Sequence, residues 1–113
     1  GETFVITRNI DKCLSVFSME EWEKYTDKLE QLPSTQAREI ARFIYSNATD
    51  VQPDSQGRVL IPAELLAYAG IEKGAVVVGC GRHAEIWAEE IWNEKNNSES
   101  EESLTELMIR LGF

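Results

Sequence analysis

An internal repeat constrains the fold of this chain more than any other feature of its sequence. The segment Cys13–Trp22 aligns with His83–Trp92 at a constant offset, since each residue of the first copy lies 70 positions before its match. Val5–Thr7 matches Val76–Val78 if one residue is inserted in the turn of the first copy. Both copies read as a strand, a short turn, a strand ending in an aromatic residue, and an acidic helix start that carries a Trp. A repeated unit of this kind predicts two similar halves.

A second informative feature is the tight turn predicted at Asp54–Arg58. Aspartate at the start of a turn accepts local backbone N–H bonds, and Gly57 permits a positive φ, so the chain can reverse direction here. Arg58 is the first residue to leave the turn. The sequence therefore places a single cation near an exposed tip.

The residues after this turn predict a strand that leads into a helix. Val59–Ile61 favours an extended, half-buried segment, because β-branched and apolar side chains suit a pleated surface. Pro62 suits the first turn of a helix, where its missing N–H is not needed, and Gly70 is predicted to cap the end of that helix. The stretch Asp54–Pro62 is therefore interpreted as a hairpin feeding a helix.

The D-x-x-G-R turn, followed by an apolar strand and Ile-Pro, resembles the hairpin of the AbrB-like bacterial transcription regulators. Further motifs occur in an order and spacing similar to those of the MraZ family: Leu65, Tyr68–Ile71, Val76–Gly79, Glu85–Trp87 and Trp92. The resemblance runs from about Phe4 to about Lys95 and covers most of the chain. Because several spaced motifs agree, it is specific.

The resemblance implies both a fold and a function. In that family two AbrB-like halves build a small barrel, several chains form a ring, and the D-x-x-G-R loops meet DNA. We therefore expect an α+β fold: an AbrB-like, double-hairpin small β-barrel of two pseudo-repeats with flanking helices. The implied role is transcriptional regulation of the bacterial division and cell-wall gene cluster, including the regulator's own promoter.

The first repeat is expected to be incomplete. Residues 54–74, which carry the hairpin and a helix, precede the second copy, whereas the first copy begins almost at Gly1. We expect a fragment or processed product that lacks an N-terminal hairpin with its own D-x-x-G-R loop. The predicted organisation has three parts. They are the C-terminal part of the first repeat with connecting helices (1–47), the second repeat (48–95), and an acidic linker with a short C-terminal helix (96–113).

Local patterns predict the elements in more detail. Hairpins are expected at residues 3–17 and 76–87, and helices at about 18–31, 35–45, 62–68 and 88–95, the first opened by the capping box Ser18–Glu21. Residues 96–102 are too acidic and polar to fold by burial. Residues 103–111 regain an amphipathic pattern, and this tail can dock on its own domain, which we favour, or on a neighbour.

The predicted DNA-binding residues are Arg58, Gln56, Ser55 and Gly57, with Asp54 and Gly57 shaping the turn. Arg58 offers a planar guanidinium that can grip guanine or a phosphate, and Gln56 and Ser55 add neutral hydrogen bonds. The alternative is that Arg58 is a surface turn residue paired with Asp54. The family pattern often has a basic residue in the loop and an Arg after the following helix's Leu, where this chain has Gln56 and Leu66.

The formal net charge of −9 is an objection to DNA binding, because nucleic-acid binders usually show a basic footprint. Screening limits repulsion between exposed charges to about 10 Å at ordinary salt, so distant acids need not prevent contact. The expected partners are therefore promoter DNA and further copies of the chain in a ring. The expected location is the cytoplasm, in association with the nucleoid.

The sequence leaves two function classes to compare with DNA binding: a protein-interaction module and an enzyme. The acidic charge favours a protein-interaction or oligomerisation module, antitoxin-like and without DNA binding. Four aromatic side chains could anchor such an interface, although we prefer to place them in the core: Phe17, Trp22, Trp87 and Trp92. We do not expect an enzyme, since no catalytic or metal-ligand spacing accompanies His83, the only histidine. Cys13 and Cys80 are interpreted as reduced, packed thiols. Neither a cofactor, a metal, a small-molecule substrate nor a membrane partner is expected.

Overall fold

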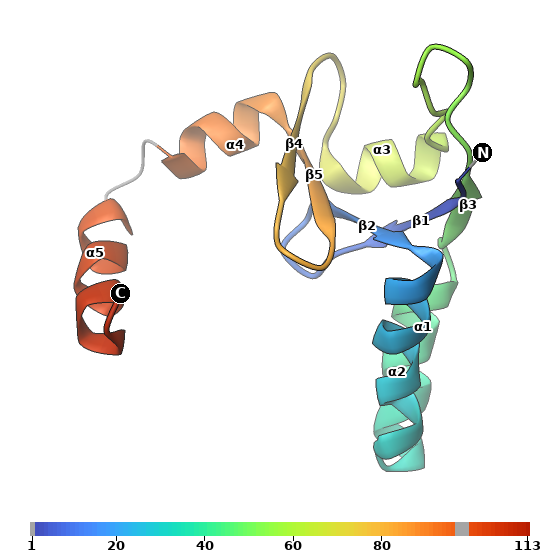
Figure 1. Ribbon diagram of the computed structural model, residues 1–113, viewed down its shortest axis with the longest axis horizontal. Coiled ribbons are helices and arrows are strands. Elements are labelled where there is room, and N and C mark those ends of the chain that lie inside the picture. The colour runs from blue at the N-terminus through green and yellow to red at the C-terminus, as the bar shows by residue number, and fades with distance from the viewer. Residues whose placement is uncertain (1, 97–99) are drawn as a thin grey trace.

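The computed structural model describes residues 2–96 and 100–113, and within them the chain forms an α+β fold (Figure 1). A five-stranded antiparallel sheet has the order β3-β1-β2-β5-β4. Its strands are β1 (Phe4–Arg8), β2 (Leu14–Ser18), β3 (Thr49–Val51), β4 (Ala75–Gly79) and β5 (Ala84–Ala88). The helices are α1 (Met19–Asp27), the 3-10 turn η1 (Lys28–Gln31), α2 (Ser34–Tyr45), α3 (Ala63–Ala69), α4 (Glu89–Asn96) and α5 (Ser100–Leu111). The α+β class is confirmed, and the fold is compatible with a small AbrB-like barrel.

Two units with the same element order meet at the centre of the sheet. The unit β1-β2-α1 and the unit β4-β5-α4 join there through β2 and β5. Ser15 pairs with Glu85, while Leu14 pairs with Ile86. Because residue 85 lies 70 positions after residue 15, equivalent residues face each other, and an approximate two-fold axis passes through this pair. The aromatic contacts also correspond, with ring centroids 5.7 Å apart for Phe17–Trp22 and 5.9 Å apart for Trp87–Trp92. These matches support the repeat seen in the sequence.

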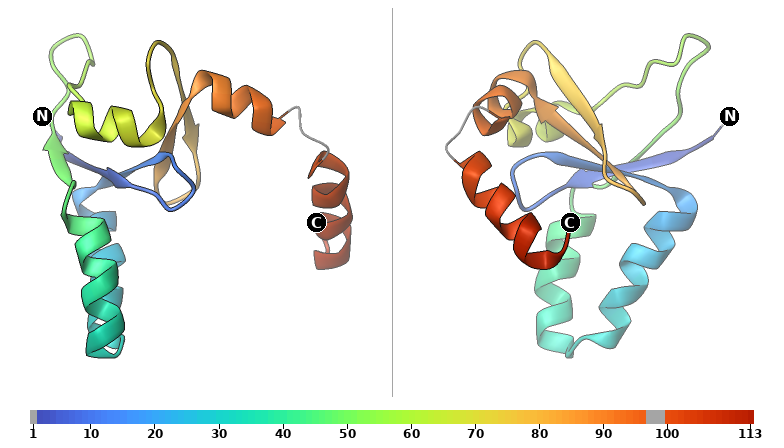
Figure 2. Two further views of the ribbon diagram at one scale, coloured as in Figure 1. Left: turned by 180° about the vertical axis from the view of Figure 1, so that it is seen from behind. Right: turned by 60° about the vertical axis from the view of Figure 1, so that its left-hand side comes forward.

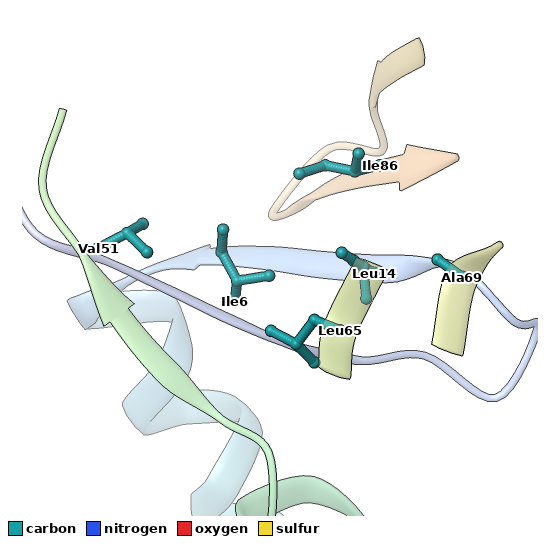
Figure 3. Packing of buried hydrophobic residues seen from close by; sticks show 6 residues of the cluster. All are labelled: Ile6, Leu14, Val51, Leu65, Ala69 and Ile86. Atoms are coloured by element: carbon teal, nitrogen blue, oxygen red, sulfur yellow. The ribbon is translucent and has the colours of Figure 1, made fainter. Parts of the chain in front are cut away.

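The main core lies between one face of the sheet and helix α3 (Figure 3). Alternate residues of a strand point to opposite faces, so Ile6, Leu14 and Ile86 share the face that α3 covers with Leu65 and Ala69. Gly70 ends α3 in the left-handed region, at φ 69°, as the sequence predicted. The core therefore fixes α3, and with it the end of the loop that precedes α3.

The opposite face of the sheet contacts the helical pair α1–α2, which projects away from it (Figure 2). Ser18 caps α1 by accepting a hydrogen bond from the Glu21 N–H at 3.2 Å, which confirms the predicted helix start. Thr7 donates a 2.6 Å hydrogen bond to the Ile44 carbonyl. Phe17 and Trp87 are buried, as expected of core residues, whereas Trp22 and Trp92 are only half-buried.

Arg8 also fastens α2 to the sheet. Its Nη2 donates to the Phe43 carbonyl at 2.9 Å and to Ser46 Oγ at 2.8 Å, and the guanidinium lies 4.4 Å from the Phe43 ring centroid. Arg8 and Thr7 therefore both attach α2 to β1.

Two local expectations were wrong. The structure assigns no strand to residues 58–62, and Val59 and Leu60 are 39% and 89% exposed instead of half-buried. An extended segment becomes a strand only when a neighbouring strand satisfies its N–H and C=O groups. The strand before the turn, β3, pairs with β1 and not with the segment that follows the turn. Residues 96–102 were predicted to be an unfolded linker, but helix α5 begins at Ser100. Residues 97–99 of that stretch lie outside the described residues.

The expected docking of the tail on its own domain is also not observed. Helix α5 lies apart from the sheet in Figure 1 and in the left view of Figure 2. Its apolar side chains remain exposed, from 38% for Leu107 to 69% for Ile109. The amphipathic pattern predicted the helix correctly but did not determine what covers it.

Candidate nucleic-acid interface

The loop between β3 and α3 projects away from the sheet, and every residue from 52 to 60 is exposed (Figure 1). It contains all five predicted site residues: Asp54, Ser55, Gln56, Gly57 and Arg58. The loop is anchored at one end by β3 and at the other by α3. An exposed tip is thus attached to regular elements on both sides.

Hydrogen bonds within the loop define its turn. The Gly57 N–H donates to the Asp54 carbonyl at 2.9 Å, and the Asp54 N–H donates to the Arg58 carbonyl at 2.8 Å. Gly57 has a φ of 79°, a conformation that costs other residues energy. A Cβ at this position would meet no atom within 4 Å, so the requirement for glycine comes from the backbone angle alone.

The Asp54 carboxylate organises the loop further. Its Oδ1 accepts the N–H groups of Gln56 and Arg58 at 2.9 and 2.8 Å. Its Oδ2 accepts a 3.0 Å hydrogen bond from Arg58 Nε. These bonds, led by that of the Arg58 backbone N–H, lower the pKa of Asp54. The carboxylate is therefore charged at neutral pH and orients the arginine.

The arginine is only partly occupied by this contact. Its side chain is 71% exposed, and the ion pair with Asp54 uses Nε. Within the described residues, the terminal nitrogens Nη1 and Nη2 have no hydrogen-bond partner. Asp54 therefore positions Arg58 as the alternative interpretation anticipated, and still leaves the outer edge of the guanidinium available to a ligand. Two parallel N–H donors on that edge suit a phosphate or the O6 and N7 of guanine.

Sequence reasoning missed a group of side chains at the turn between β4 and β5. Cys80, His83 and Glu85 have ligand atoms that all lie within 4.8 Å of one another. The spacing C-x-x-H-x-E could have revealed them, because residues i and i+3 flank a hairpin turn and residue i+5 shares a strand face with i+3. Cys80 is exposed rather than packed, whereas Cys13 is fully buried, and burial raises the pKa of Cys13 to about 12.

Fold and loop together define a class: an α+β protein of two hairpin-and-helix units that presents an arginine-bearing loop away from its core. None of the described helices has the length and apolar character needed to cross a bilayer. A family model described as "MraZ protein, putative antitoxin-like" matches residues 1–42 and 44–111. The chain belongs to the MraZ family.

Curated relatives agree with this assignment. The chain is 42% identical over its full length to the transcriptional regulator MraZ of Clostridium tetani (strain Massachusetts / E88), of which it covers 82%. It is 45% identical, again over its full length, to the protein of the same name from Clostridium beijerinckii (strain ATCC 51743 / NCIMB 8052), also covering 82%. The match to the Thermoanaerobacter sp. (strain X514) protein of that name is 44% identical, over 87% of this chain and 70% of the relative.

Proposed function

We propose that this protein is a DNA-binding transcriptional regulator that contacts promoter DNA through Ser55, Gln56, Gly57 and Arg58. The observation that carries the proposal is the available outer edge of the Arg58 guanidinium on an exposed, internally bonded loop. Three curated relatives of similar sequence are named transcriptional regulators, which supports the same role here.

The chemistry of the loop supports phosphate and base contact. Asp54 fixes Arg58 through Nε, so less conformational entropy is lost when the two terminal nitrogens bind. Gly57 lets a phosphate approach the backbone closely, since no Cβ projects there. Ser55 and Gln56 contribute neutral donors and acceptors beside the cation.

Energetics requires several such loops. A good bidentate arginine contact is worth about 1 to 3 kcal/mol, whereas a complex with a dissociation constant near 10 nM requires roughly 11 kcal/mol. The protein therefore acts as a homo-oligomeric ring whose loops bind repeated short promoter elements. The targets are the division and cell-wall gene cluster and the regulator's own promoter, at the nucleoid in the cytoplasm.

Arg58→Ala tests this function when compared with Arg42→Ala. Arg42 is a matched control, because it is 72% exposed and also pairs with a carboxylate, Glu39, at 3.8 Å. Both variants remove one positive charge, so a general electrostatic effect would weaken DNA binding equally. We expect fluorescence anisotropy with the protein's own promoter DNA to show a loss of at least about tenfold for Arg58→Ala only.

Arg58→Lys adds a second comparison, because lysine keeps the charge and loses the planar fork. Affinity intermediate between the parent chain and Arg58→Ala is expected. Equal affinity of Arg58→Ala and the parent chain would remove the loop from the mechanism.

A second candidate function is a protein-interaction module. The exposed apolar side chains of α5 favour it, as does the antitoxin-like description of the family. In that case the chain would act through protein contacts, and Arg58→Ala would leave its activity unchanged. The anisotropy comparison therefore separates the two candidates.

A further inference from the structure

Cys80, His83 and Glu85 form a compact group of three different metal-ligand types. The ligand atoms lie within 4.8 Å of one another, and His83 Nε2 is 3.9 Å from Glu85 Oε2. Ligands of a tetrahedral zinc ion at ordinary bond lengths are roughly 3.5 Å apart, so each separation within the group must shorten by about 1.3 Å at most. Cys80 is exposed and can make this adjustment by side-chain rotation.

The hairpin explains why these residues meet. The Cys80 N–H donates to the His83 carbonyl at 2.8 Å, closing a turn in which Gly81 has a φ of 85°. Cys80 and His83 therefore face each other across the turn. Glu85 lies two residues beyond His83 in β5, and alternation along a strand places both side chains on one face.

Neighbouring side chains hold two of the three ligands in place. Trp87 Nε1 donates to Glu85 Oε1 at 2.9 Å, and the His83 ring stacks on Phe17 with centroids 5.4 Å apart. Glu85 Oε2 accepts a long, 3.4 Å hydrogen bond from Asn9 Nδ2 and faces His83 and Cys80. In known metal sites, hydrogen bonds and packing contacts of this kind orient the side chains that bind the metal.

The hairpin fold itself does not require these residues. With one residue inserted in the turn of the first copy, the equivalent positions in the other repeat unit are Asn9, Cys13 and Ser15, and that unit also forms a hairpin. Only the unit formed by β4 and β5 therefore carries the three ligand types together. His83 and Glu85 also line a surface cavity of about 470 Å³, which provides room for a bound water.

We propose that Cys80 Sγ, His83 Nε2 and Glu85 Oε2 bind a divalent cation of the zinc class, with water as the fourth ligand. A set of one sulfur, one imidazole nitrogen and one carboxylate oxygen suits Zn²⁺ better than the hard cations Mg²⁺ and Ca²⁺, which prefer oxygen ligands. Binding forms a metal–thiolate bond, and the thiol proton passes to solvent. The site links the two strands next to their turn, so the metal stabilises the β4–β5 hairpin.

The test uses the full, untagged chain with Co²⁺ and Zn²⁺ as probes. Co²⁺ bound by a thiolate gives a charge-transfer absorption, which Zn²⁺ then abolishes by displacement. His83 is the only histidine in the chain, so its ring signals in proton NMR report its coordination without assignment by mutation. Both signals are expected to change up to one equivalent of metal.

Variants complete the experiment. Cys80→Ser, His83→Gln and Glu85→Gln are each expected to weaken Zn²⁺ binding by more than about tenfold, the lower bound seen for loss of outer-shell contacts alone. Glu72→Gln is the matched control for Glu85→Gln, because it removes one exposed carboxylate outside the group. Equal affinity in all four variants would overturn the site, as would Co²⁺ binding without a thiolate band or a His83 shift. These readouts contain no DNA, so their outcome is independent of the proposed function.

Discussion

Asp54 uses its two carboxylate oxygens for different tasks. Oδ1 accepts two backbone N–H groups and shapes the turn, whereas Oδ2 accepts Arg58 Nε and orients the guanidinium. Asparagine can also accept backbone N–H bonds through its amide oxygen, but it carries no charge. The two tasks can therefore be separated by substitution.

Asp54→Asn is expected to preserve the turn and release Arg58, while Asp54→Ala is expected to disrupt both. Amide hydrogen exchange at Gln56 and Arg58 should remain slow in the first variant and become faster in the second. DNA affinity should fall in both variants, because an unrestrained arginine loses more entropy on binding. Asp50→Asn, at an exposed position of β3, is the control. Loss of amide protection in Asp54→Asn would contradict this division of tasks.

The same residue gives the loop a pH dependence. The hydrogen bonds to Asp54, above all that from the Arg58 backbone N–H, lower its pKa in the folded state. Its stabilising contribution is therefore present above the pKa of the unfolded chain and is lost as pH falls through the lower, folded value. An acid titration of the Gln56 and Arg58 amide shifts should show a midpoint below the ordinary aspartate value of about 3.9.

At the scale of elements, the sequence predicted what local chemistry determines. The Ser18 cap, the Gly70 terminator and the two hairpins are encoded within a few residues, and all were located correctly. The strand expected at Val59–Ile61 was wrong because pairing depends on a distant partner. Arg8 was missed for a similar reason, since its partners Phe43 and Ser46 lie 35 and 38 residues further along the chain.

The candidate site shows the same limit. The position of the Asp54–Arg58 turn could be predicted, because Asp and Gly have strong local preferences. The sequence could not predict that Arg58 pairs with Asp54 through Nε, because this choice depends on side-chain geometry. The cluster of Cys80, His83 and Glu85 needed a hairpin register that periodicity alone does not provide.

Helix α5 provides a test of element packing. Leu65 in α3 is 1% exposed, whereas Leu107 in α5 is 38% exposed. Leu65→Ala should lower the free energy of unfolding by about 2 to 5 kcal/mol, because it leaves a cavity in the core. Leu107→Ala should change it by no more than about 0.5 kcal/mol, as expected for a surface position. Urea denaturation measures both. A comparable loss in Leu107→Ala would show that α5 packs on the body of the protein in solution.

At the scale of the whole molecule, charge and assembly are linked. A chain with a net charge of −9 is repelled by DNA at long range, and this repulsion is screened beyond about 10 Å at ordinary salt. In the proposed function, attraction comes from the projecting loops. The proposed ring would present many loops together and so multiply this local attraction.

DNA affinity is expected to depend on the number of repeated DNA elements that the loops can contact. Shortening the protein's own promoter by one repeated element at a time should weaken binding on the order of tenfold per element, because each loop contributes a similar contact. Arg58→Ala should show much less dependence on DNA length, since its loops lack the guanidinium. Anisotropy titrations measure the affinities, and light scattering at the same concentrations measures the assembly. A chain that remains monomeric, or that binds one element as tightly as several, would contradict the multi-loop mechanism, because a single arginine contact is too weak to account for specific binding.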